Sequence, residues 1–255
     1  MNVSHEQSPG LIAYPDIAHA FFSREGGLST GPFASLNVSE AVGDDPELVD
    51  DNRRMVAAAL GFAPRHLIVL KQVHSNKVLT VTGPLEGLRP EADAMVTTRR
   101  GLLLGILTAD CTPILLADPE TNVIGAAHAG WRGAVDGIVA ATIEAMTGLG
   151  ARPERMVAAI GPTISAFNYE VGPQFRADFL AAHPDGEDFF TTPEGGRHHF
   201  DLPRFVVHQL EAAGVSQVDQ VGGCTYANPE RYFSHRFATH HGTPTGRQIA
   251  AIGLT

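Results

Sequence analysis

The sequence predicts a single α/β domain over residues 1–255, and three observations support this prediction. Short apolar runs separated by turn residues predict three strands, over residues 102–108, 113–117 and 123–127. The segment that follows, 134–147, has apolar residues at intervals of three and four and is followed by glycine, which is typical of an amphipathic helix. No segment of the chain repeats, so one domain is the simplest organisation.

Helical and extended patterns alternate along the rest of the chain. Helices are expected over 46–60 and 202–213, and strands over 78–82 and 156–160. The stretch 185–199 is rich in glycine, proline and charge, and it predicts a surface loop.

The composition narrows the class of protein. Hydrophobic residues make up 44% and charged residues 18%, as in ordinary globular proteins. The 18 basic and 28 acidic residues give a net charge of -10, so we expect no nucleic-acid partner. Residues 1–10 do not resemble a signal peptide, and the longest apolar stretch, 101–107, is too short to span a bilayer. We therefore expect a cytoplasmic, monomeric protein that does not bind membranes, with Cys111 and Cys224 reduced.

Three segments each place a metal-ligating side chain beside glycine or a turn, and these side chains are His74, Cys111 and His128. Two imidazoles and one thiolate suit zinc, and three protein ligands leave a fourth position for water or substrate, as in catalytic sites. The spacings of 37 and 17 residues match no short zinc motif. Taken singly, a cysteine between two apolar strands is more often a small buried residue, and each histidine is more often structural.

Two segments have features of anion-binding loops. Gly130, Arg132 and Gly133 lead into the predicted helix, where free backbone amides and a guanidinium favour an anion. The alternative is that the glycines let a strand meet a helix and that Trp131 packs. The segment 22–37 combines glycines, a proline and hydroxyls around Arg24, which suits a loop that approaches a phosphate or a sugar, or an ordinary turn.

Ordered motifs along nearly the whole chain resemble the bacterial laccase-domain family, also described as multicopper polyphenol oxidases, peptidoglycan-editing factors and purine nucleoside phosphorylases. The motifs lie at residues 22–37, 42–46, 52–53, 72–74, 92–94, 108–111, 128–133, 160–162, 169–172 and 245–247. The chain departs from the family pattern in having Gly223-Cys224 where paired cysteines are usual. It also has Ser234-His235-Arg236-Phe237 where the family usually has Ser-Tyr-Arg-Arg, so Phe237 stands in place of the second arginine.

The resemblance implies a four-layer α/β/β/α architecture with mixed β-sheets and a Zn²⁺ held by His74, Cys111 and His128. It implies phosphorolysis of purine nucleosides (adenosine, inosine and methylthioadenosine) and adenosine deaminase activity, with a nucleoside and phosphate as the small-molecule partners. Cys111 and His128 are then catalytic residues as well as ligands. The candidates for a general acid are Asp93, Asp110 and Glu170. The candidates for substrate and phosphate binding are Arg24, Asn37, Gln72, Arg132 and Arg236.

Three other functions use some of the same residues. Two histidines and a cysteine can form a blue-copper site, so a Cu²⁺-dependent polyphenol oxidase is one alternative. Against it, the ligands are scattered along the chain and the remaining histidines are mostly single. A metal-free hydrolase of cell-wall precursors with a Cys111–His128 dyad is another, and it leaves His74 without a role. A zinc-stabilised binding module is the third, and it predicts a fourth protein ligand.

Overall fold

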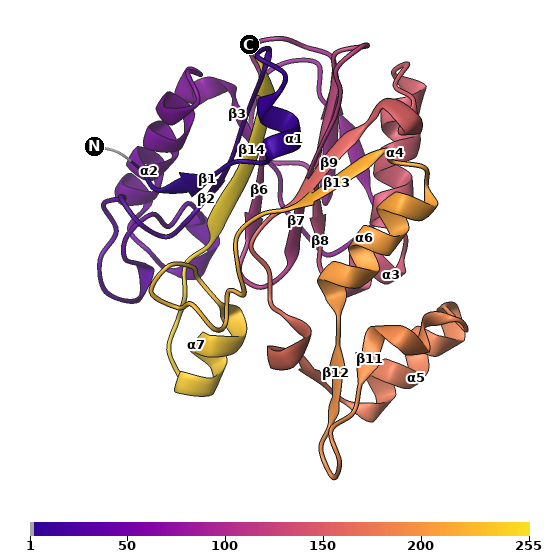
Figure 1. Cartoon of the computed structure of the whole chain (residues 1–255). Helices are drawn as coiled ribbons and strands as arrows, with labels where there is room; N and C mark the ends of the chain where they lie inside the picture. Colours follow the sequence, from indigo (N-terminus) through magenta and orange to yellow (C-terminus); the bar gives the residue numbers. More distant parts are fainter. Residues whose placement is uncertain (1–2) are drawn as a thin grey trace.

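Two large sheets form the centre of the computed structural model, which describes residues 3–255 (Figure 1). The five-stranded sheet has the order β1 (His5–Glu6), β2 (Ile17–Phe22), β14 (Gln248–Leu254), β6 (Leu103–Thr108), β3 (Leu67–Val69). The six-stranded sheet has the order β13 (Gln217–Gln220), β9 (Val157–Ile160), β7 (Thr112–Asp118), β8 (Val123–Ala129), β5 (Ala94–Thr97), β4 (Val78–Thr80). Both sheets are mixed, because β3–β6, β4–β5 and β9–β13 pair in parallel and the other pairs are antiparallel.

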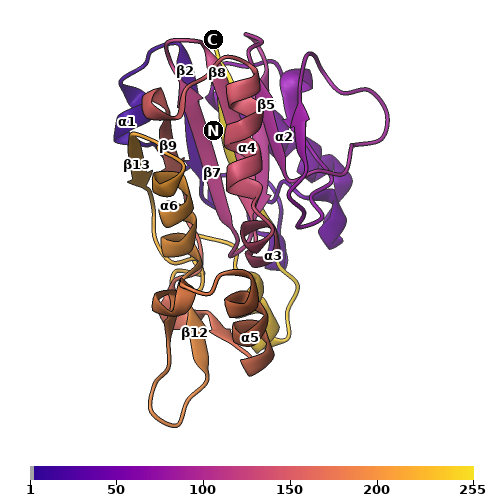
Figure 2. The ribbon, with the colours of Figure 1, turned by 90° about the vertical axis from the view of Figure 1, so that its right-hand side faces the viewer.

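The two sheets pack face to face, and helices cover their outer faces. Helix α2 (Pro46–Ala59) packs on the five-stranded sheet. Helices α4 (Ile138–Gly148) and α6 (Leu202–Ala212) pack on the six-stranded sheet (Figures 1 and 2). The strands show why this arrangement is stable: in β7, Leu115 and Ala117 point between the sheets while Ile114 and Leu116 point toward the helices. The mixed α/β fold expected from the sequence is confirmed.

The predicted helix over 134–147 was wrong in its boundaries. The structure has two helices there, α3 (Trp131–Val135) and α4, and Gly137 separates them with a φ of 89°. Glycine adopts this left-handed conformation without the steric penalty of a Cβ, so the chain can turn between the two helices. The apolar periodicity continues across the break, which is why the pattern suggested one helix.

A third, small sheet lies at the lower end of the molecule in Figure 1, beside α5 (Pro173–Ala182). It has the order β10 (Glu170–Val171), β12 (His198–Phe200), β11 (Phe190–Thr191). The prediction of a loop over 185–199 was therefore wrong for part of this range, which contains a 3-10 turn at Gly186–Phe189, β11 and the start of β12. Phe190 of β11 and Phe200 of β12 pack against Phe179 in a buried aromatic cluster, and these contacts stabilise the pairing of the two short strands.

The remaining helices are short. They are α1 (Pro9–Ile12), α7 (His235–His241) and 3-10 turns at Gly31–Phe33, Glu40–Val42, Pro64–His66, Pro153–Arg155 and Ala166–Asn168. Among residues 3–255, no helix combines the length and the apolar character that crossing a membrane requires.

The packing between the sheets yields a stability prediction. Leu115 is fully buried between them, so Leu115→Ala removes apolar contacts and leaves a cavity, and we expect the free energy of unfolding to fall by about 2–5 kcal/mol. Urea unfolding followed by circular dichroism measures this change. Leu88 is 98% exposed, and Leu88→Ala should change the same quantity by less than about 0.5 kcal/mol. Equal effects of the two substitutions would contradict the assigned core.

Candidate metal centre

Two connections that cross from the five-stranded to the six-stranded sheet carry two of the predicted ligands. His74 lies between β3 and β4, and Cys111 lies between β6 and β7. The third ligand, His128, is near the end of β8, opposite Pro113 at the beginning of β7. The antiparallel register of β7 and β8 therefore brings His128 beside the connection that carries Cys111.

The three side chains form a compact cluster. Their ligand atoms all lie within 4.8 Å of one another, and Cys111 Sγ is 3.8 Å from His74 Nε2. Sulfur and nitrogen ligands of one tetrahedral zinc are separated by roughly 3.6 Å, as its bond lengths require. His128 is buried, Cys111 is partly buried and His74 is exposed, so the cluster is accessible to solvent on the His74 side. The donor set and its spacing fit zinc with an open position.

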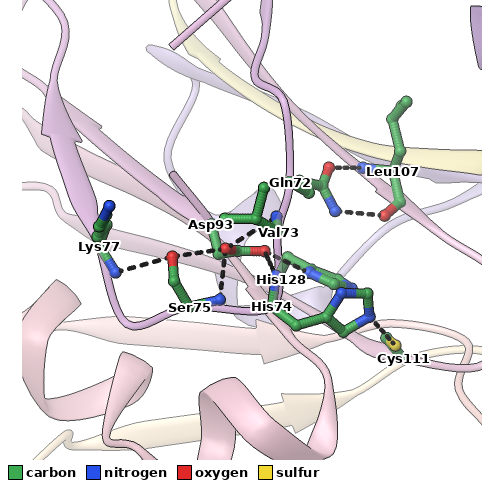
Figure 3. Close-up of polar contacts among 9 residues, drawn as sticks. All are labelled: Gln72, Val73, His74, Ser75, Lys77, Asp93, Leu107, Cys111 and His128. Carbon is green, nitrogen blue, oxygen red and sulfur yellow. Dashed lines mark hydrogen bonds and ion pairs between the residues drawn. The ribbon is translucent and has the colours of Figure 1, made fainter. Parts of the chain in front are cut away.

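A buried carboxylate, that of Asp93, fixes the orientation of two of the ligands (Figure 3). It accepts hydrogen bonds from the backbone N–H groups of Val73 (3.2 Å), His74 (2.9 Å) and Ser75 (2.7 Å), and from Ser75 Oγ (2.8 Å). It also accepts one from His128 Nδ1 at 2.9 Å. Because Nδ1 is used in this way, Nε2 of His128 is the nitrogen left to bind a metal, an arrangement common around protein-bound zinc.

Electrostatics within the cluster favour the ligating form of the thiol. Burial alone would raise the pKa of Cys111, but the charge of His128 and the hydrogen bonds with both imidazoles outweigh it and lower the pKa to about 6. Burial alone would lower the pKa of His128, but the thiolate and Asp93 raise it to about 9. Burial also opposes ionisation of Asp93, yet hydrogen bonds from His128 and Ser75 hold its pKa far below the usual range.

Backbone conformation at the two crossing connections is unusual. His74 has a φ of 61° and Asp110 a φ of 86°, both in the left-handed region that non-glycine residues rarely adopt. The Asp110 carboxylate accepts hydrogen bonds from Thr225 Oγ1 and from the backbone N–H of Arg236, both at 2.6 Å. These bonds stabilise the turn that presents Cys111, and they connect it to α7.

Other predicted site residues support the cluster from neighbouring segments. The Gln72 side chain donates from Nε2 to the carbonyl of Leu107, and its Oε1 accepts from the backbone N–H of Leu107, both at 2.8 Å. These two bonds hold the segment that carries His74 against the end of β6. Arg236 donates from Nη1 to the carbonyl of Glu170 at 3.0 Å, and the Glu170 carboxylate pairs with Arg197 at 3.0 Å. Both Arg236 and Glu170 thus lie on segments that meet near Asp110.

The remaining predicted substrate and phosphate ligands have mostly structural contacts. Arg24 donates to the carbonyls of Ala34 and Pro229, each at 2.6 Å. The buried Asn37 side chain accepts from the backbone N–H of Arg247 at 2.9 Å and donates to Asp44 at 2.8 Å.

The position of Arg132 differs from the expected anion-binding helix start. It lies inside α3, a helix of five residues, exposed and with its guanidinium 4.5 Å from the centre of the Trp131 ring. Trp131 itself packs against Phe175. The helix begins at Trp131 instead of near Ala134 and is short, so Arg132 lies in its first turn, and its contact with an anion stays a prediction.

Sequence reasoning missed several residues of the site. Ser75 donates hydrogen bonds to Asp93, and the half-buried Arg247 and Tyr169 lie near enough to Cys111 for its charge to shift their pKa values. Gly130, which the sequence placed in a candidate anion-binding loop, also lies against His74 and Cys111. Burial, reinforced by the charges of Cys111 and Asp110, raises the pKa of Tyr169 so that its phenol stays protonated. Tyr169 and Arg247 belong to matched sequence motifs, and those motifs were the available signal.

With this geometry established, comparison with known proteins identifies the family. The chain belongs to the family described as multi-copper polyphenol oxidoreductase laccase, whose model matches residues 18–255. It is 45% identical over 251 residues to a Deinococcus radiodurans protein named purine nucleoside phosphorylase, covering 97% of this chain and 94% of that one. It is 43% identical to a Streptomyces griseus protein named purine nucleoside phosphorylase ORF3, with both chains fully covered. The resemblance inferred from the motifs is confirmed.

Solved structures support the fold. YlmD from Geobacillus stearothermophilus superposes with a TM-score of 0.88 at 32% identity, covering 99% of each chain. A Neisseria meningitidis protein described as DUF152 superposes with a TM-score of 0.87 at 32% identity, covering 100% of this chain and 99% of that one.

Gly130 offers a steric test of the cluster. A Cβ at this position would lie 2.5 Å from His74 Cδ2 and 3.2 Å from Cys111 Sγ, while its φ of −72° suits any residue. Gly130→Ala should therefore reduce metal content severalfold, measured by elemental analysis, while the circular dichroism spectrum is retained. Gly172 is a matched control, since it also precedes a helix, has a φ of −79° and has nothing within 4 Å of a built Cβ. Full metal occupancy in Gly130→Ala would contradict the assigned geometry.

The pKa values predict a pH dependence for the metal-free protein. The lowered pKa of Cys111 stabilises the fold at high pH and this contribution is lost as the pH falls through about 6. The raised pKa of His128 stabilises the fold at low pH and this contribution is lost as the pH rises through about 9. The ion pair should therefore exist between these values. Iodoacetamide modification of Cys111 in chelator-treated protein should have a midpoint near pH 6, and a midpoint above pH 8 would contradict the thiolate assignment.

Proposed function

We propose that this protein is a zinc-dependent purine nucleoside phosphorylase that acts on adenosine, inosine and methylthioadenosine and also deaminates adenosine. The observation that carries the proposal is the cluster of His74, Cys111 and His128, oriented by Asp93 and accessible to solvent on one side. The names of the relatives support the purine nucleoside and phosphate as substrates. The cytoplasmic location, the monomeric state and the lack of a nucleic-acid partner stay predictions.

The donor set favours zinc over copper. Among residues 3–255, one cluster of three histidine, cysteine or acidic ligands is present. A multicopper oxidase needs several such groups, and a blue-copper site usually adds a weak axial ligand to its two histidines and cysteine. Three ligands with an open position instead match catalytic zinc. Bound there, zinc would supply a Lewis acid that activates water or orients phosphate.

The acidic residues near the cluster differ in the proton chemistry that they can perform. Asp93 accepts five hydrogen bonds and stays ionised, so we assign it a positioning role. Both carboxylate oxygens of Asp110 are also used. Glu170 is partly exposed and pairs with one arginine, so it stays our candidate for the general acid, and Tyr169, whose phenol stays protonated, can donate a hydrogen bond.

Phosphorolysis requires little covalent chemistry from the protein. The C1′–N9 bond of the nucleoside breaks, a phosphate oxygen bonds to C1′, and the departing purine takes a proton. The protein must therefore hold phosphate below the ribose and donate one proton, so positioning and charge account for the catalysis. Arg132 is exposed and is our candidate for the phosphate contact, with Arg236 and Arg247 as cations near Asp110.

One observation favours a second function, a metal-free cysteine hydrolase. Cys111 is ionised beside a charged His128, which Asp93 orients, as in a nucleophile–base–acid arrangement. This alternative gives His74 no role, although His74 Nε2 lies 3.8 Å from the sulfur. Metal content separates the two functions, because Cys111→Ser loses zinc only if Cys111 is a ligand.

Incubation of the purified protein with inosine or adenosine, with and without phosphate, tests the proposal. Free base and ribose 1-phosphate should appear only with phosphate, and adenosine should also yield inosine. Arg132→Ala should raise the phosphate requirement about tenfold or more, as expected when one charged hydrogen bond is lost.

Two cysteine variants control this experiment. Cys111→Ser should lose zinc and activity, whereas Cys224→Ser should keep both, because Cys224 Sγ contacts Ser165 and Asn168 rather than the cluster. Base release at an undiminished rate without phosphate would contradict phosphorolysis, and retention of zinc by Cys111→Ser would contradict the metal assignment.

A further inference from the structure

Away from the metal centre, a cavity of about 260 Å³ lies where α2 and β3 meet the segment 85–89. Its polar lining consists of Glu40, Asp50, Arg53, Arg65 and Arg89. No ligand of the metal centre lines it. The chain has a net charge of -10, so a cavity lined by three guanidinium groups differs in charge from the protein as a whole. This local excess of arginine indicates a site for an anion.

Positive charge exceeds negative charge around this arginine-lined cavity. The Glu40 carboxylate is shared between Arg53 and Arg89, and Asp50 pairs with Arg54 at 2.5 Å outside the set. Arg65 is exposed, and among residues 3–255 no carboxylate lies within ion-pairing distance of it. Two carboxylates, Glu40 and Asp50, therefore line the cavity with three guanidinium groups, and Asp50 also pairs with Arg54 outside it.

Arg53 is the most buried of the three arginines, with 12% of its side chain exposed. Its Nε donates to the carbonyl of Val38 at 2.8 Å and its Nη1 to Glu40, but its Nη2 is buried without a hydrogen-bond partner. Burial lowers the pKa of Arg53 and the charge of Arg89 lowers it further, and together they outweigh the opposite effects of Glu40 and Asp50. A buried donor without an acceptor destabilises the folded protein, and repulsion between the like charges of Arg53 and Arg89 adds to this cost. An oxyanion bound in the cavity would reduce both unfavourable contributions.

We propose that the arginine-lined cavity is a second binding site, separate from the metal centre, for a phosphate group. Guanidinium groups bind phosphate oxygens with paired hydrogen bonds, which suits this chemistry. The cavity volume exceeds that of one oxyanion, so the phosphate is either the free ion or the end of a small phosphomonoester.

Isothermal titration of the purified, metal-loaded enzyme with inorganic phosphate and with ribose 5-phosphate, at constant ionic strength, tests this site. The double variant Arg65→Gln/Arg89→Gln should weaken binding of the preferred ligand at least tenfold. Arg99→Gln removes an exposed arginine that does not line the cavity, and it should change the dissociation constant less than twofold. Tighter binding of phosphate would identify the free ion as the occupant, and tighter binding of ribose 5-phosphate would identify the ester; both outcomes support the site.

Three further measurements complete the test. Cys111→Ser should retain this binding event, because the arginine-lined cavity does not involve the metal centre. Arg65→Gln alone should weaken binding without changing the thermal unfolding temperature, which covers the case in which the double variant is unstable. Binding unchanged in both arginine variants would overturn the proposal. Equal displacement by chloride would also overturn it, by showing an adventitious ion only.

Discussion

The candidate metal centre depends on the hydrogen bonds of one buried carboxylate. Asp93 accepts from three consecutive backbone N–H groups, at residues 73–75, and from the His128 ring. The bonds from the backbone N–H groups fix the loop that carries His74, and the bond from the ring fixes the tautomer of His128. A single ionised side chain thus orients two ligands that lie 54 residues apart in the chain. Its own burial is tolerated because these donors replace the hydration that it loses.

The sheet topology explains why such distant residues meet. The chain crosses from the five-stranded to the six-stranded sheet twice, between β3 and β4 and between β6 and β7, and these two connections hold His74 and Cys111. Residue 93, just before β5, lies beside β8, and its carbonyl accepts from the backbone N–H of His128 at 2.7 Å. The fold therefore supplies the cluster from the ends of packed strands and the connections between them, which limits the movement of the ligands.

Part of this arrangement could be predicted from the sequence. The apolar runs of β6, β7 and β8 are continuous enough to identify buried strands, and residue chemistry together with the family motifs predicted the three candidate ligands that the fold brings together. The interruption at Gly137 could not be predicted, because the apolar periodicity of α3 continues into α4. The strands β11 and β12 are two and three residues long, and they are held by the Phe179 cluster rather than by a local pattern. Asp93 was recognised as a motif residue, but its positioning role depends on contacts between segments that only the fold brings together.

The central claim is that Asp93 organises a zinc site, and the zinc affinity of Asp93→Asn tests it most directly. The amide keeps the size of the side chain but removes its charge and half of its acceptor capacity. Measured by competition with a chromogenic chelator, the zinc dissociation constant should rise about 10- to 100-fold, as for other residues that orient zinc ligands. Circular dichroism should show that the fold is retained. A folded Asp93→Asn protein with unchanged zinc affinity would contradict the account.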